Sequence, residues 1–134
     1  MTNASPASTR AQGRASEDLA ASFLEARGLV VCARNVTLAH AELDLVARLR
    51  GETDVPDTIV FVEIRSRRDD RAGGPAETVG RAKQRRLVRA ATAWLLREGL
   101  WERVAVRFDV VAILFGNDEA PEITWIPGAF EVDG

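Results

Sequence analysis

The stretch Ile59-Val60-Phe61-Val62-Glu63-Ile64-Arg65 decides the fold class of this chain, because it is an apolar run with charged residues near its end. Its β-branched and aromatic residues predict a strand over residues 58–65. Similar runs predict strands over residues 29–35 and 41–49 before it, and over 104–114 and 122–126 after it. Turn residues separate the first three strands, which are therefore expected to form a meander.

Two helices are expected around these strands. Ser16 is expected to cap a helix that runs to Arg27, with Gly28 at its C-terminal end. A longer helix is predicted over residues 77–98, after a loop over residues 66–75. The inner face of this second helix contains Leu87, Ala90, Ala91, Trp94 and Leu95. The order helix, three strands, helix, two strands predicts an α/β fold in which helices flank a mixed sheet.

The length of 134 residues suits one domain with a single hydrophobic core. We expect a flexible N-terminal tail over residues 1–12, one domain over 13–130 and a C-terminal tail over 131–134. No apolar run approaches the roughly 18 to 20 residues that span a bilayer, and the start has no stretch like a signal peptide. A cytoplasmic protein with no membrane partner is expected, and the single Cys32 fits a reducing compartment.

The charge is unevenly distributed along the chain, although the net charge is only −2. Residues 64–97 contain ten basic and three acidic residues, whereas residues 108–134 contain six acidic and no basic ones. A basic segment of this kind can present a positive face to phosphates. The simpler interpretation, that these arginines only solvate a helix, stays open for the basic run taken alone.

Carboxylates interrupt two of the predicted strands. Glu42 and Asp44 are two residues apart and should share a face, while Leu43 and Leu45 point into the opposite layer. A carboxylate in an apolar strand is costly unless it is paired or bound to a cation, and two adjacent carboxylates repel each other. A hard divalent cation relieves both penalties. Simple cross-strand ion pairs, with Glu63 and Arg65 at a sheet edge, remain the alternative.

A combination of motifs extends beyond this spacing. The segments that carry it are Gly13 with Glu17, Arg34-Asn35, Ala41-Glu42-Leu43-Asp44-Leu45-Val46-Ala47, Phe61-Val62-Glu63-Ile64-Arg65-Ser66-Arg67, Lys83 and Arg107-Phe108-Asp109-Val110-Val111. On these residues the chain resembles the bacterial YraN family of endonuclease-like proteins and, more distantly, the archaeal Holliday-junction resolvases. Both carry the PD-(D/E)xK core of restriction endonucleases. The resemblance spans about residues 13–130.

The resemblance implies a restriction-endonuclease-like fold and a metal site. Asp44 and Glu63 would bind Mg²⁺ or Mn²⁺, with the peptide carbonyl of Ile64 also near the metal and with Glu17 in a supporting role. The position of Glu17 gives it a second interpretation, since a glutamate directly after a capping serine stabilises a helix N-terminus by interacting with the helix dipole. Resolvase-like proteins cut two strands as dimers, so a homodimer is expected by analogy.

One position departs from the family pattern. Arg65 stands where the pattern has a lysine that contacts the scissile phosphate. An arginine can neutralise phosphate charge but is effectively never deprotonated, so it cannot act as a base. Two explanations stay open: replacement of lysine by arginine has weakened activity, or Lys83, the only lysine, reaches the site from the second helix.

The expected function is therefore metal-dependent hydrolysis of phosphodiester bonds in DNA, at branched or otherwise abnormal structures. The alternative is a non-catalytic nucleic-acid-binding module that keeps the fold. In both cases the expected backbone contacts are Arg67, Arg68, Lys83, Arg85, Arg86 and Arg89. His40 lacks a second histidine or paired cysteine and is not expected to act, and Asp109 is expected to pair with an arginine. Trp94 is expected in the core; Trp101 and Trp125 are expected to pack, with stacking on unpaired bases as the alternative.

Overall fold

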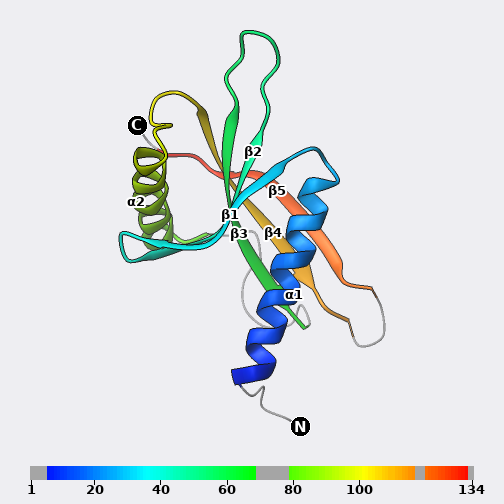
Figure 1. Ribbon diagram of the computed structural model, residues 1–134. Helices are drawn as coiled ribbons and strands as arrows, with labels where there is room; N and C mark the ends of the chain where they lie inside the picture. Colours follow the sequence, from blue (N-terminus) through cyan, green and yellow to red (C-terminus); the bar gives the residue numbers. More distant parts are fainter. Residues whose placement is uncertain (1–5, 69–78, 117–119, 133–134) are drawn as a thin grey trace.

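The computed structural model describes residues 6–68, 79–116 and 120–132. Its elements run in the order α1 (Pro6–Glu25), β1 (Val30–Leu38), β2 (Ala41–Leu49), β3 (Thr58–Arg67), α2 (Arg81–Arg97), β4 (Ala105–Leu114) and β5 (Glu122–Phe130) (Figure 1). The predicted α/β class, with two helices and five strands, is confirmed.

The five strands form one sheet in the order β1-β2-β3-β4-β5. Neighbouring strands are antiparallel, except that β3 and β4 are parallel. The sheet is therefore mixed, as predicted, and α2 lies in the connection between the two parallel strands.

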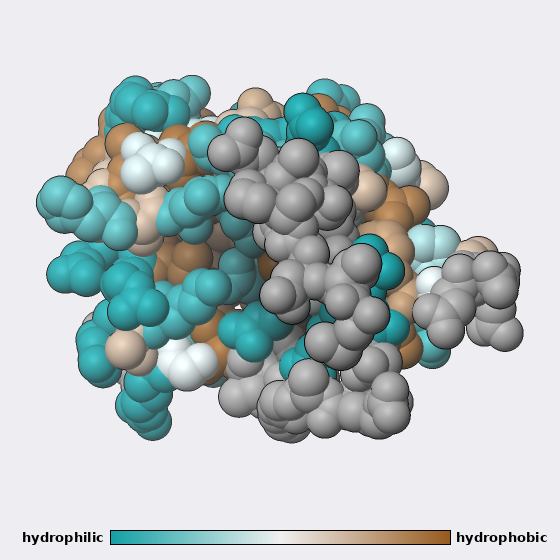
Figure 2. Space-filling view, turned by 90° about the horizontal axis from the view of Figure 1, so that it is seen from below, coloured by the Kyte–Doolittle hydropathy of each residue, from teal (hydrophilic) through white to brown (hydrophobic). Residues whose placement is uncertain are grey.

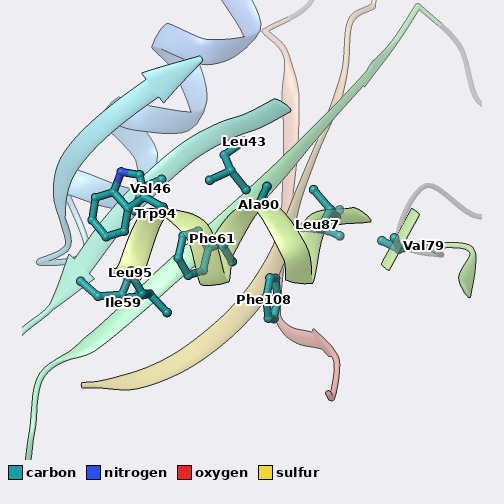
Figure 3. Packing of buried hydrophobic residues seen from close by; sticks show 12 residues of the cluster. Leu43, Val46, Ile59, Phe61, Val79, Leu87, Ala90, Trp94, Leu95 and Phe108 are labelled. Atoms are coloured by element: carbon teal, nitrogen blue, oxygen red, sulfur yellow. The ribbon is translucent and has the colours of Figure 1, made fainter. Parts of the chain in front are cut away.

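The two helices cover different hydrophobic clusters of the sheet, because alternate strand residues point to opposite faces. The α2 cluster joins the helix residues Leu87 and Trp94 to Phe61 and Phe108 of the sheet (Figure 3). The α1 cluster joins Leu24 to other buried strand residues, which are Leu45, Ala47, Val60, Val62, Val111 and Ile113. Figure 1 shows the two helices lying apart, with the sheet between them.

The first helix begins at Pro6, ten residues before the expected cap at Ser16. Residues 6–12, which we expected in the tail, are helical, whereas residues 1–5 lie outside the described part. Ser16 is within α1 and only 2% exposed, so the capping prediction was wrong. The Ala-rich segment before Ser16 favours helix and lacks a strong breaker, so nothing local stops the helix there. Gly28, with φ of 91°, ends this region as predicted.

The second helix begins at Arg81 rather than at residue 77. Gly80 has extended backbone angles and is the N-cap residue, and the buried Val79 precedes it. The expected helical residues 77 and 78 lie outside the described ranges, as do residues 69–75 of the expected loop. Glycine has a poor helix propensity, which explains a start after Gly80.

The expected alternation in β2 fails at one residue. Leu45 packs in the α1 cluster as part of the opposite layer, but Leu43 belongs to the α2 cluster. The ladder between β2 and β3 ends at Leu45↔Val62, and Asn35 on the neighbouring strand has a positive φ of 51°. Before Leu45, β2 pairs only with β1 and no longer with β3. The strict alternation of its side chains between the two faces of the sheet is therefore lost there.

Candidate functional site

The two predicted metal-binding carboxylates lie where β2 and β3 separate. Their ladder ends at Leu45↔Val62, so Asp44 and Glu63 are the next residues on the two strands. The backbone amide of Ile64 donates to Oδ2 of Asp44 at 2.9 Å. The carboxylate of Asp44 thus accepts the hydrogen bond that a backbone carbonyl of β2 would accept in a continued ladder. This contact holds the Asp44 side chain next to the strand that carries Glu63.

A cavity of about 330 Å³ opens over this point, between the sheet and α2. The sheet side contributes Glu42, Asp44 and Glu63, and α2 contributes Lys83 and Arg86; the remaining lining residues are His40, Ala41 and Leu87. Three carboxyl groups and two cationic side chains therefore face one space, in a volume typical of small-ligand pockets.

The surroundings of Asp44 disfavour its charged form. Burial is the main cause that raises the pKa of Asp44 to about 8, and a hydrogen bond to the carboxyl group of Glu63 contributes to the rise. The negative charges of Glu63 and Glu42 act in the same direction, while the Ile64 amide opposes them. At neutral pH, and without a cation, Asp44 therefore retains its proton.

Glu63 is more deeply buried than Asp44, with only 7% of its side chain exposed. Its Oε2 forms an ion pair with Nζ of Lys83, which lies on α2. The same Oε2 receives no hydrogen bond of acceptable geometry from the described residues. This buried carboxylate oxygen is therefore neutralised by Lys83 but retains unused capacity to accept a hydrogen bond or to coordinate a cation.

These groups fit a hard divalent cation. Glu63, whose Oε2 accepts no hydrogen bond from the described residues, and Asp44, whose pKa is raised, are oxygen donors that a cation would relieve of mutual repulsion. Within residues 6–68, 79–116 and 120–132, no three His, Cys, Asp or Glu side chains are grouped closely enough to form a metal site by themselves. The donor set is therefore a carboxylate pair, which suits Mg²⁺ or Mn²⁺ completed by water and phosphate.

Two further predicted catalytic residues, Arg65 and Glu17, do not line the carboxylate cavity. Arg65 is on the strand of Glu63, partly buried, and forms no ion pair with any residue that the structure describes. Glu17 is on α1 and accepts a hydrogen bond from Nδ2 of Asn35 at 2.8 Å. Its interpretation as a helix N-terminal residue was wrong, because α1 begins at Pro6. Glu17 does not line the cavity, so the structure does not bring it to the carboxylate pair.

The predicted phosphate-binding residues divide into three places. Lys83 and Arg86 line the carboxylate cavity. Arg85, Arg86 and Arg89 line a second cavity, beside the C-terminal end of β5. Arg67 and Arg68 lie at the end of β3, as it leaves the sheet. Sequence reasoning missed the second cavity, since its β5 wall is far along the chain from α2.

Asp109 has the structural role predicted for it. Its carboxylate is 1% exposed and accepts two hydrogen bonds from the guanidinium of Arg107, at 2.8 and 2.9 Å. It also accepts one from the indole of Trp125 and one from the amide of Gly128. Asp109 is thus fully occupied, and Trp125 is held by it and by Phe23 rather than free to stack on a base. Trp94 packs as expected, while Trp101 is 45% exposed.

His40 lines the carboxylate cavity although sequence reasoning gave it no role. It has a positive φ of 62° in the turn between β1 and β2. The turn between β1 and β2 therefore places the His40 side chain at the edge of the carboxylate cavity. The spacing of two residues from Glu42 was the only sequence signal for its position.

None of the described helices is both long and apolar enough to cross a membrane.

The sequence is similar to several bacterial proteins over most of its length. It is 48% identical to a UPF0102 protein of Anaeromyxobacter dehalogenans over 125 residues, which are 93% of this chain and 87% of the relative. It is 43% identical to one of Syntrophotalea carbinolica, covering 91% of this chain and 93% of the relative. A Pseudomonas aeruginosa relative is 39% identical, with 92% and 95% covered. The sequence pattern of the uncharacterised protein family UPF0102 matches residues 16–113, so the chain belongs to this family, the YraN family that its motifs resemble.

Proposed function

We propose that this protein is a metal-dependent endonuclease that hydrolyses phosphodiester bonds in DNA, on a restriction-endonuclease-like fold. The observation that carries the proposal is the pair Asp44 and Glu63, which line one cavity at the point where β2 and β3 part. Two carboxyl groups on one partly buried cavity wall are costly for stability, and among the described residues only Glu63 is offset by an ion pair, with Lys83.

The metal would be held by Asp44 and Glu63, with the carbonyl of Ile64 as the third protein donor. Bound there, Mg²⁺ or Mn²⁺ supplies a positive charge that polarises a phosphoryl group and acidifies a water molecule. Asp44 would hold the cation as a carboxylate, so its proton would have to be released to solvent on binding. Glu63 lines the same cavity, with Lys83 beside it.

Lys83 takes the role that Arg65 cannot fill. Its ammonium contacts Glu63, although its side chain is 43% exposed, so it stands between the carboxylate pair and solvent. A lysine can both neutralise phosphate charge and exchange a proton with an attacking water. Arg65, two residues after Glu63 on the same strand, adds a permanent positive charge that stabilises the transition state.

The alternative function is a non-catalytic module that binds DNA. Arg65 favours it, because a permanently charged side chain stands where the family pattern has lysine. In this case Lys83 only neutralises Glu63, and the basic residues bind the DNA backbone without cleavage.

Cleavage of a labelled branched DNA with Mn²⁺ distinguishes the two functions. We expect the wild type to cut the substrate, and Asp44→Ala and Glu63→Gln to lose at least about a hundredfold in rate. Asp18→Ala is a matched control, because Asp18 is an exposed carboxylate that pairs with Arg34 on the outside of α1. DNA binding with no cleavage by the wild type would instead establish the non-catalytic module.

The location and assembly that we propose follow from this function. A protein acting on DNA with an exposed free thiol at Cys32 would work in the reducing cytoplasm. The described chain holds one carboxylate pair, so cutting both strands at one place would need a homodimer on the substrate. A labelled RNA of the same shape, used as a competitor, tests the preference for DNA.

A further inference from the structure

A second and larger cavity, of about 640 Å³, lies between α2 and the C-terminal end of β5. Four arginines of α2 line it: Arg81, Arg85, Arg86 and Arg89. The opposite wall contains Phe130, Glu131 and Val132, while Val88 adds an apolar side chain from the helix. Figure 2 shows hydrophilic residues on the α2 side of the molecule, with apolar patches between them.

The arginines form an ordered positive row. Arg81, Arg85 and Arg89 are four residues apart, so they share one face of α2 at intervals of about 6 Å. Within the described ranges none of the four lining arginines forms an ion pair, and Glu131 is the one acidic residue that lines the cavity. The cavity therefore keeps a positive excess that suits a polyanion.

The two cavities adjoin at Arg86, which lines both of them. An anionic ligand in the second cavity could thus contact the same arginine that borders the carboxylate pair.

The apolar wall offers an aromatic ring that is already held in place. Phe130 stacks on Phe108 with ring centroids 4.8 Å apart and an interplanar angle of 22°. Phe108 in turn stacks on Phe61 of the core at 5.5 Å. Phe130 is only partly buried and lines the cavity, so a ring fixed by the core presents its remaining surface to a ligand.

A cavity that combines a row of arginines with a partly exposed aromatic ring suits an unpaired DNA strand better than a duplex. A duplex offers phosphates but keeps the faces of its bases in its own stack, whereas an unpaired strand offers both phosphates and free base faces. From the arginine row, the held ring and the arginine shared with the carboxylate cavity, Arg86, we propose that this cavity binds unpaired single-stranded DNA adjoining the cleavage site. The inference rests on the proposed function, whose substrate class it narrows.

Fluorescence anisotropy with a labelled oligothymidine and a labelled hairpin duplex of equal length tests the proposal. Binding is measured in EDTA over a salt series, so cleavage cannot interfere. We expect Arg85→Ala/Arg89→Ala to weaken oligothymidine binding at least about tenfold and to reduce the salt slope by roughly 1.4, which is two contacts on a single strand. The duplex should be affected less.

A charge-matched control separates the cavity from general electrostatics. Arg14→Ala/Arg103→Ala removes two exposed arginines outside the cavity and should leave oligothymidine binding nearly unchanged. Phe130→Leu keeps an apolar side chain against Phe108 but removes the ring, and should weaken oligothymidine binding by about fivefold or more without changing duplex binding. Thermal unfolding of Phe130→Leu shows whether it is folded.

Three results would overturn the inference: equal losses in the two double variants, unchanged oligothymidine binding by Arg85→Ala/Arg89→Ala, or equal losses for duplex and oligothymidine. Failure of the proposed nuclease function is separate from these. It would appear as wild-type protein, with Mn²⁺, that does not cut DNA while the anisotropy differences between the variants remain.

Discussion

At the scale of single residues, the protonation of Asp44 is the feature with the widest consequences. Its carboxyl group is held by the Ile64 amide, lies against Glu63 and keeps a pKa of about 8. In the unfolded chain the same group titrates near the ordinary value of 3.8. Folding therefore takes up one proton at neutral pH, and this proton must leave before a cation can bind.

The stability of the metal-free protein should consequently fall as pH rises. Between pH 4 and 8 the folded state holds a proton on Asp44 that the unfolded state lacks, so the contribution is complete below pH 4 and lost as pH passes about 8. Asp44→Asn mimics the protonated form and should become more stable than the wild type across this window. Thermal unfolding in EDTA from pH 5 to 9 measures the difference in stability between Asp44→Asn and the wild type. A difference that does not change with pH would contradict the raised pKa.

Lys83 should matter more for cleavage than its partial exposure suggests. Lys83→Ala leaves Glu63 buried without its cation, which should cost about 1–3 kcal/mol of stability and lower the single-turnover cleavage rate about a hundredfold or more. Lys83→Arg should restore the stability but not the rate. A variant Lys83→Ala that cuts at the wild-type rate would leave Lys83 with a purely structural role.

At the scale of secondary-structure elements, Asp109 joins β4 to β5. The register between these strands shifts between Phe108 and Val110, and the carboxylate of Asp109 binds Gly128, which has a positive φ of 61°. Arg107 neutralises the charge from two residues away on the same strand. A buried charge thus stabilises the irregular part of the ladder, where backbone groups lack regular partners.

Asp109→Ala should therefore destabilise the protein strongly, by about 3–5 kcal/mol, because Arg107, Trp125 and Gly128 all lose their acceptor. The affinity of the remaining folded protein for DNA should not change. Urea denaturation gives the stability, and anisotropy at low temperature gives the affinity. Glu122→Ala, an exposed carboxylate at the start of β5, is the control.

The connection between β2 and β3 depends on Gly51. A Cβ atom there would collide with the backbone of Val55 and lie 2.5 Å from the carbonyl oxygen of Pro56. The Gly51 amide also donates to Asp57 at 2.8 Å. Gly51→Ala should lower the melting temperature by several degrees, whereas Gly80→Ala, with no atom within 4 Å of its added Cβ, should have a small effect. Similar losses in both variants would show that the crowding is relieved easily.

At the scale of the whole molecule, the sheet separates two chemical environments. The α2 side carries the carboxylate pair, the arginine row and both cavities. The α1 side buries an apolar cluster and the occupied Asp109. A net charge of −2 therefore conceals a row of arginines on the α2 side, where we propose that DNA binds.

One carboxylate pair per described chain gives an expectation for plasmid cleavage. With Mn²⁺ and little protein, supercoiled plasmid should become nicked first, because one molecule can cut one strand. With protein in excess, paired molecules should give linear plasmid directly. Gel electrophoresis over a protein titration measures both products, and linear plasmid as the first product at the lowest concentrations would mean that the protein is a stable dimer before it meets DNA.

Much of the architecture followed from local patterns. The five apolar, β-branched runs, the apolar faces of the two helices and the turn residues between them predicted the strands and helices, because these signals are local. The same patterns placed Asp44 and Glu63 on neighbouring strands. Helix starts were less predictable: α1 extends ten residues before the expected cap at Ser16, whereas α2 begins only after Gly80.

The sequence by itself determined which residue types this protein carries in its strands and helices, and therefore its α/β class and its candidate carboxylates. Only the tertiary structure decided that the surroundings raise the pKa of Asp44, that Lys83 reaches Glu63, and that Phe130 completes an arginine-lined cavity. The physical reason is that secondary structure depends on neighbours in the chain, whereas protonation and cavities depend on how strands end and helices pack, which joins residues far apart in sequence.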